Sequence, residues 1–497
     1  MQRRRQVKWN ILAALLYQVV MAVSGLVLPR FVLEYYGSET NGLMQLISQL
    51  LGYAVLLEGG VGGVVLAMLY KPLADGDSEA ISNVFHDTRR LFGKISWVFT
   101  AFSLGLSVVL VWIVDTSFDW LYVMTLVLVL ALNVYFNYYF GMAHQLLIRA
   151  DQKLYVVQLT QSIATAVNVV LCILVMRWGG SIHMVKLTTV LVFLLDPLVY
   201  RLYVRRHYQI RPAGQCCGDG LPQKRDAVVH HIAFFIHRNT DVVLLSFFSG
   251  VTSASVYSVY NAVILVMENL LGTISSGVAG AVGNMFAREE KRSLETSFEL
   301  YEACNTVLCM AFSTVAAVMI LPFVEIYTAG IRDAQYIQPL FAWLMIGAGL
   351  MYCIRMPYGT VVSAAGHYQQ TRSGAVCEVA INLTVSLLLV KPFGLAGVAM
   401  GTFLAMTYRT VYMVWYLSRN ILHRPMYLFV VRLMYSLVLC GLLIAAIHVW
   451  LPVQAQTLAE LIVQAIKVSA VVFPAFAVAE LLFGWGLRRA GQKTKTE

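Results

Sequence analysis

The sequence has few charged residues, and this shortage excludes a soluble globular protein. Charged side chains make up 12% of the 497 residues and hydrophobic side chains 59%, and the mean hydropathy is +0.71. Soluble domains carry about a quarter charged residues. Many apolar stretches here exceed the ~18 residues that cross the hydrocarbon core of a bilayer. We therefore predict an all-α polytopic membrane protein.

The sequence also lacks the short motifs that mark common active sites. It contains no phosphate-binding glycine loop, catalytic triad or metal motif. The adjacent Cys216 and Cys217 have no second pair at metal-binding spacing. His237 and Asp241 are one helical turn apart, but no second His or Cys helix complements them. We therefore expect no catalytic residue, no metal site and no cofactor.

Fourteen apolar segments are predicted to cross the membrane, centred near residues 19, 55, 103, 129, 165, 194, 240, 265, 312, 348, 380, 406, 439 and 471. With a cytosolic N-terminus, 26 of the 36 Lys and Arg residues fall on the cytosolic side and five on the opposite side. Cytosolic loops of membrane proteins carry this excess, so both termini are predicted to be cytosolic. The net charge of +10 then reflects topology, and no nucleic-acid partner is expected.

Landmark residues recur along the chain at a nearly constant offset. The sequence numbers of Gly37 and Gly250 differ by 213, and each glycine precedes a long apolar helix with an internal glutamate, Glu58 or Glu268. Further pairs whose numbers differ by 213, 214 or 215 are Gly59 and Gly272, Asp151 and Gly366, Asn168 and Asn382, and Gly180 and Gly394. A fixed offset indicates two structural copies of one unit.

The repeat predicts two lobes of six helices in parallel orientation, followed by two extra helices. We expect an N-lobe at residues 1–205, a cytosolic linker at 206–227 and a C-lobe at 228–420. Residues 421–497 hold the two extra helices and a basic cytosolic tail.

Several stretches carry a family resemblance that covers most of residues 9–425. They include LPRFVLEYYGSETNGL, LLEGGVGG, NTDVVLL, YSVYNAV, YCIRMPYGTVVSAAGHYQQT and GLAGVAMGTFLAMTYRTVYMVWYLSRNI. With these stretches the chain resembles the multidrug/oligosaccharidyl-lipid/polysaccharide (MOP) flippase superfamily, and within it the O-antigen and capsule flippases of the polysaccharide transporter branch. The resemblance implies two lobes around a central cavity that opens alternately to either side of a bacterial cytoplasmic membrane.

Arginines inside the apolar spans are the candidate substrate-binding residues. Charged side chains are costly in a span and usually face a wet cavity. A guanidinium group stays charged and forms forked hydrogen bonds to phosphate oxygens, which suits a pyrophosphate. The alternative role for each arginine, as for Arg432, is snorkelling or pairing with a nearby acid. The candidates are Arg30, Arg238, Arg355 and Arg409.

Acids inside the spans are the candidates for coupling transport to H⁺ or Na⁺. Desolvation raises the pKa of a buried carboxylate and a nearby cation lowers it, so such a group can exchange a cation in one conformation only. An inter-helix hydrogen bond or a structural ion pair is the alternative role. The candidates are Glu58, Glu268, Asp241 and Glu378.

The resemblance implies a transporter that flips a lipid-pyrophosphate-linked oligosaccharide from the inner to the outer leaflet for cell-surface polysaccharide biosynthesis. An undecaprenyl-pyrophosphate-linked glycan is then the cargo, and a glycan polymerase is a candidate partner. A cation-coupled drug or metabolite antiporter of the same superfamily and a lipid II flippase remain alternatives. A glycan polymerase or ligase needs a substantial extracytoplasmic loop, whereas the outer connections here are short. We therefore expect no enzymatic activity.

Overall fold

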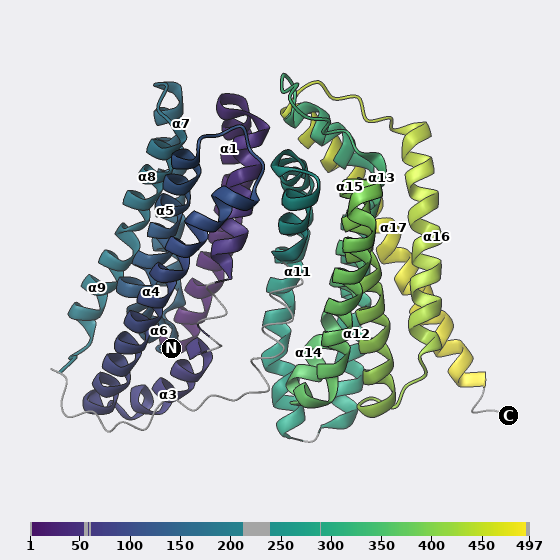
Figure 1. Cartoon of the computed structure of the whole chain (residues 1–497). Coiled ribbons are helices and arrows are strands. Elements are labelled where there is room, and N and C mark those ends of the chain that lie inside the picture. Colours follow the sequence, from purple (N-terminus) through teal and green to yellow (C-terminus); the bar gives the residue numbers. More distant parts are fainter. Residues whose placement is uncertain (1, 54–57, 59–60, 212–238, 289, 494–497) are drawn as a thin grey trace. The chain divides into compact units, whose positions relative to one another are not determined.

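The computed structural model describes residues 2–53, 58, 61–211, 239–288 and 290–493, and these residues form helices joined by short connections, with no β-strand among them (Figure 1). The first helices are α1 (Gln2–Gly52), α3 (Val61–Asp75), α4 (Ser78–Ile113), α5 (Trp120–Phe136), the π-helix η1 (Asn137–Gly141), α6 (Met142–Ala150), α7 (Leu154–Arg177), α8 (Ile182–Phe193) and α9 (Leu195–His207). They are followed by a short helix (Asn239–Phe248), α11 (Val251–Ala287), α12 (Lys291–Tyr327), α13 (Pro339–Ile354), α14 (Met356–Ala364), α15 (Tyr368–Asn420), α16 (Tyr427–Trp450) and α17 (Leu458–Lys493). The all-α fold class is confirmed.

The chain forms two compact units, unit 1 (Met1–Ser255) and unit 2 (Val256–Glu497). The linker predicted at 206–227 falls mostly outside the described residues. The predicted lobe boundaries therefore stay a prediction.

Eleven described helices are long and apolar enough to cross a membrane. Two of them, Lys8–Gly52 and Tyr368–Asn420, each contain a glycine with non-helical backbone angles, Gly37 and Gly394. Each is therefore two helical segments joined at a kink. The spans predicted near residues 55 and 240 lie partly outside the described residues, so the count of fourteen stays a prediction.

The backbone has unusual angles at positions that match in the predicted repeat. Gly37 and Gly250, whose numbers differ by 213, have φ angles of 80° and 83°. Positive φ angles also occur in two further pairs at offsets of 214 and 215, which are Gln152 with Gly366 and Gly179 with Gly394. Glycine adopts such angles most readily, and these positions interrupt the helices at matching points of the two copies. These matching angles agree with the duplication inferred from the sequence, although two of the pairs are shifted by one residue from those predicted.

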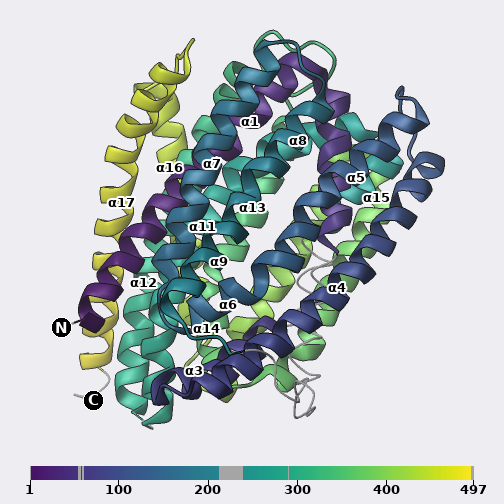
Figure 2. The ribbon, with the colours of Figure 1, turned by 90° about the vertical axis from the view of Figure 1, so that its left-hand side faces the viewer.

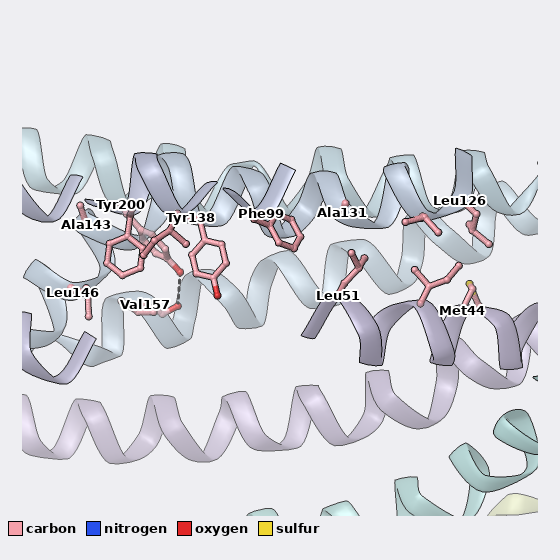
Figure 3. Packing of buried hydrophobic residues seen from close by; sticks show 14 of the residues in the cluster. Met44, Leu51, Phe99, Leu126, Ala131, Tyr138, Ala143, Leu146, Val157 and Tyr200 are labelled. Carbon is pink, nitrogen blue, oxygen red and sulfur yellow. Dashed lines mark hydrogen bonds between the residues drawn. The ribbon is translucent and has the colours of Figure 1, made fainter. Parts of the chain in front are cut away.

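The membrane helices of unit 1 lie lengthwise beside one another (Figure 2). Contacts between neighbours give the order α4, α5, α8, α7 and α1. Aromatic side chains fill the interior between them, where the rings of Phe99 and Tyr138 meet edge to face with centroids 6.3 Å apart (Figure 3). Nearby, the Tyr200 hydroxyl donates to the carbonyl of Val157 over 3.5 Å. A ring with a satisfied hydroxyl can be buried without leaving a polar group unpaired.

In unit 2, α12 contacts α13, α16 and α17, and α13 packs against α15. A buried ion-pair network joins α12 to the last two helices. Glu302 accepts from Arg424 over 2.6 and 2.8 Å and also from Arg432, and Arg432 reaches Glu480 on α17 at 3.0 Å. The negative charges of the two carboxylates equal the positive charges of the two guanidinium groups. The network therefore adds no net charge to the core.

Candidate functional site

A proline interrupts the helix that carries Arg355. Pro357 has no N–H to donate, so it cannot make the usual helical hydrogen bond to the carbonyl of Cys353. The Asn305 side chain on α12 donates to that carbonyl over 3.0 Å instead. The neighbouring helix α12 thus supplies the hydrogen bond that the carbonyl of Cys353 lacks within its own helix. A helix break inside a membrane requires such a partner, because no water is there to replace it. The break ends α13 at Ile354 and begins α14 at Met356, with Arg355 between them.

Two arginines meet one glutamate at this break. Arg355 Nη1 lies 2.8 Å from Glu378 Oε1, and Arg409 Nε lies 3.5 Å from Glu378 Oε2. Arg409 also donates through Nη1 to the carbonyl of Thr371 over 3.1 Å. The side chains of Arg355, Glu378 and Arg409 are 13%, 11% and 6% exposed. We call these three residues the Glu378 cluster.

Two tyrosine rings contact the guanidinium groups of the cluster, and a glycine leaves space for one of them. The guanidinium carbon of Arg355 lies 5.1 Å from the centroid of Tyr352, and that of Arg409 lies 5.5 Å from the centroid of Tyr412. Both arrangements are favourable cation–π contacts. A Cβ at Gly374 would stand 2.5 Å from Arg409 Nη1, so the absence of a side chain there makes room for this guanidinium.

The Glu378 cluster lies deep in the membrane-spanning part of unit 2. Arg355, Glu378 and Arg409 lie nine, ten and eleven residues from Ala364, Tyr368 and Asn420, the helix ends on one common side. At 1.5 Å per residue, each is about 15 Å along its helix from that end. Charged groups so deep in a span are candidate functional groups.

Within the Glu378 cluster two guanidinium groups share one carboxylate, and a second carboxylate lies near the same break. Glu268 on α11 is close enough to act electrostatically on the thiol of Cys353, as Arg355 does. The packing agrees, since the adjacent Met267 and nearby Ile264 contact α13 at Gly349. Four of the eight residues predicted from the sequence therefore gather around the α13–α14 break, which are Arg355, Arg409, Glu378 and Glu268.

Of the other four predicted residues, three belong to unit 1 and one lies outside the described residues. Arg30 lies in α1 with its Nη2 4.0 Å from Glu34 one turn later. Glu58 lies in unit 1, where its carboxylate acts electrostatically on Tyr138. Asp241 is 3% exposed, also in unit 1. Arg238 lies outside the described residues.

The network around Glu302 is not predicted from the sequence. Glu302 stands near the start of an apolar run and resembles a boundary residue, yet it is 2% exposed. Its partners Arg424 and Arg432 come more than a hundred positions later in the chain. No spacing rule connects residues so far apart. The alternative role considered for Arg432, pairing with an acid, is the one that the structure shows.

Unit 1 does not repeat the charges of the Glu378 cluster. At the repeat offset of 214, Arg355 corresponds to Gly141 in η1, and Glu378 corresponds to Ala164. At the same offset, Arg409 corresponds to Leu195, whose neighbour in the chain is Asp196. Asp196 is 8% exposed, and its Oδ1 has no hydrogen-bond partner among the described residues. Unit 1 thus has no charged residue at the three positions that correspond to the Glu378 cluster, although the acid Asp196 follows one of them.

Solved structures with the same arrangement of helices identify the fold. The chain aligns with an inward-facing multidrug resistance MATE-family transporter of the MOP superfamily over 82% of this chain and 98% of that one, with a TM-score of 0.65 and 14% identity. A MATE transporter in complex with MaL6 aligns over 83% and 96%, with a TM-score of 0.59 and 13% identity. The lipid II flippase MurJ in its inward closed conformation aligns over 94% and 97%, with a TM-score of 0.55 and 13% identity. The chain has the MOP superfamily fold.

The fold expected from the superfamily resemblance is the fold that these solved structures share. The solved structures of this fold named above are transporters and a flippase. Comparison with protein-family models and with curated proteins finds no match. At 13–14% identity the structural likeness shows the fold alone, and the polysaccharide branch stays a prediction.

Proposed function

We propose that this protein flips a lipid-pyrophosphate-linked oligosaccharide from the inner to the outer leaflet of a bacterial cytoplasmic membrane by alternating access, for cell-surface polysaccharide biosynthesis. The observation that carries the proposal is the Glu378 cluster. It places two guanidinium groups, with only one carboxylate between them, about 15 Å inside the spans. A pyrophosphate is the anion that such a pair of groups suits, because guanidinium binds phosphate oxygens through forked hydrogen bonds.

Glu378 acts in this proposal as an internal competitor for the substrate. While ionised it holds Arg355 at 2.8 Å and Arg409 at 3.5 Å, and both arginines are engaged. When the pyrophosphate arrives, Arg355 turns from the carboxylate to a phosphate oxygen. Glu378 loses one of its two cationic neighbours and takes up a proton more easily. Binding of the anion is thereby linked to binding of a proton at the same cluster.

The length of the match with the lipid II flippase gives further support. An alignment over 94% of the 497 residues leaves only a small part of the chain unmatched. Helices α16 and α17 are 24 and 36 residues long, so the match must include part of them. The alignment with the multidrug transporter covers 82% and leaves three times as much of the chain unmatched. A flippase of lipid-linked cargo is favoured for this reason, with lipid II itself as the nearest alternative substrate.

The test is a flipping assay in proteoliposomes with a polyprenyl-pyrophosphate oligosaccharide. Arg355→Gln and Arg409→Gln should each lower the initial rate at least tenfold, since each removes one of two phosphate ligands. The matched control is Arg419→Gln, an exposed arginine at the end of the same helix as Arg409, and it should keep the wild-type rate. Wild-type rates in both cluster variants at equal protein would refute the proposal.

A cation-coupled drug antiporter is the second candidate, because the multidrug transporter gives the higher TM-score, 0.65 against 0.55. The same variants distinguish it. An antiporter of cationic drugs should lose efflux in Glu378→Gln and keep it in Arg355→Gln. A flippase of an anionic lipid should show the greater loss in Arg355→Gln.

A further inference from the structure

Unit 1 contains a basic pocket that the proposed transport function does not use. The pocket has a volume of about 420 Å³ and lies between α4 and η1. Three of its lining residues, Arg89, Arg90 and Lys94, are cationic, and Trp97 and Tyr139 add two aromatic rings. Gly93 also lines it, and a Cβ there would meet no atom within 4 Å. The space is therefore bounded by charge and by rings, with an open floor at the glycine.

The sequence of α4 places this pocket at a membrane boundary. Residues 95–114 are free of charge, and at 1.5 Å per residue they span about 30 Å, the thickness of a hydrocarbon core. Lys94 stands just before this run and Asp115 just after it. Trp97 is 65% exposed near one end and Trp112 is 84% exposed near the other, as in the aromatic belts at membrane interfaces. The cationic residues of the pocket thus lie at headgroup level.

Neighbouring contacts hold the start of α4 in place. Asp77 caps the helix by accepting from the backbone of Glu79 and Ala80 over 3.0 Å each. The segment after α9 packs back onto this end, where the backbone N–H of Arg211 donates to the Ser82 hydroxyl over 3.0 Å. His86, which also lines the pocket, lies 2.8 Å through Nε2 from the carbonyl of Arg211. The rim of the pocket is therefore fixed by the fold.

We propose that this pocket binds the phosphate headgroup of an anionic glycerophospholipid from the leaflet on its side, which the charge distribution predicts to be the cytosolic one. Arg89 and Lys94 bind the phosphate, since both are exposed and basic pockets between membrane helices are suited to anionic headgroups. Trp97 and Tyr139 contact the glycerol backbone and the upper acyl chain. A free phosphate ion would gain nothing from these rings, so the observations favour a lipid over a soluble anion. The binding does not depend on the nature of the transported cargo.

Native mass spectrometry of the full-length protein in detergent, titrated with dioleoyl phosphatidylglycerol, tests this site. The wild type should retain one tightly bound phosphatidylglycerol and no phosphatidylcholine. The double variant Arg89→Gln, Lys94→Gln should bind it about 30-fold more weakly, the loss expected for two basic side chains near a membrane surface. The control double variant Lys8→Gln, Lys71→Gln removes two other exposed lysines of unit 1 and should change the affinity less than threefold.

A steric pair of variants separates shape from charge. Gly93→Leu fills the pocket without altering any charge and should abolish the tight binding. Gly105→Leu makes the same change further along α4, where a Cβ also meets no atom within 4 Å, and should keep it. Equal affinity in wild type and both pocket variants would overturn the proposal. So would displacement of the lipid by equimolar inorganic phosphate, or by equimolar polyprenyl pyrophosphate, because either result would assign the pocket to another anion.

Discussion

Replacing Glu378 with glutamine should destabilise the protein far more than replacing either arginine that it binds. The reason is the stoichiometry of the cluster, in which one carboxylate holds two guanidinium groups. Two unit charges about 4 Å apart attract by about 4 kcal/mol at an effective dielectric constant of 20. Glu378→Gln removes two such attractions and leaves two like charges facing each other in a buried site. Arg355→Gln or Arg409→Gln removes one attraction and leaves a neutral pair.

The net cost follows from measured buried pairs, in which loss of one partner costs about 3–5 kcal/mol. We expect this cost for Glu378→Gln, and less than about 2 kcal/mol for each single arginine variant. Since one kcal/mol shifts the melting temperature of a domain the size of unit 2 by about 2–4 °C, Glu378→Gln should lower it by roughly 6–20 °C. The double variant Glu378→Gln, Arg409→Gln should melt higher than Glu378→Gln, because it removes one of the two unpaired cations.

The assay is thermal unfolding of the purified protein in detergent, followed by intrinsic fluorescence. The variants and the wild type form a double-mutant cycle, which isolates the coupling between the neighbours. A Glu378→Gln protein that melts with the wild type would mean that the cluster is solvated. A double variant that melts below Glu378→Gln would mean that the two guanidinium groups do not repel each other. Either result would refute the charge count on which the proposed function rests.

Three further predictions concern other parts of the fold. Glu302→Gln leaves Arg424 and Arg432 without their shared carboxylate and should cost about 3–5 kcal/mol, seen as early release of α16 and α17 in hydrogen exchange. Gly394→Ala forces a side chain onto a backbone with φ 53° and should cost about 1–3 kcal/mol, whereas Gly441→Ala, in a helix with open space, should not lower the melting temperature. Burial, and secondly its 2.5 Å hydrogen bond to Asp151, raise the pKa of Tyr208 above its usual 10.0. The hydroxyl therefore stabilises the folded state fully below pH 10, and this stabilisation is lost as the pH rises through the raised pKa. The free energy of unfolding lost in Tyr208→Phe should accordingly be constant below pH 10 and disappear above the raised pKa.

The fold could be predicted from the sequence largely because glycines and prolines determine where helices break. Gly37, Gly250 and Gly394 are local signals, and each proves to have a positive φ angle. Gly37 and Gly250 recur at an offset of 213, and this recurrence predicts the duplication. The locations of the two last helices also followed from their apolar length. These features depend on a residue and its immediate neighbours, which a single sequence records directly.

The candidate site could be predicted only as a set of residues, not as an arrangement. Intramembrane charge identified Arg355, Arg409 and Glu378 as candidates, but it gave Arg30 and Asp241 the same standing. Arg355 lies between α13 and α14, whereas Glu378 and Arg409 lie in α15 on either side of its kink at Gly394. Only the packing of α13 against α15 brings the three residues together. The Glu302 network shows the same limit, since its ion pairs join residues more than a hundred positions apart.

The repeat explains why the fold was more predictable than the site. A break in a duplicated helix requires a backbone conformation with a positive φ angle. Glycine adopts this conformation readily in either copy. The side chain beside the break has no such constraint, so one copy can hold Arg409 where the other holds Leu195 at the corresponding position. If both units bound the same anion, this position would be expected to be cationic twice. Because it is not, we assign anion binding to unit 2 alone, and Leu195→Arg in unit 1 should add no second binding site.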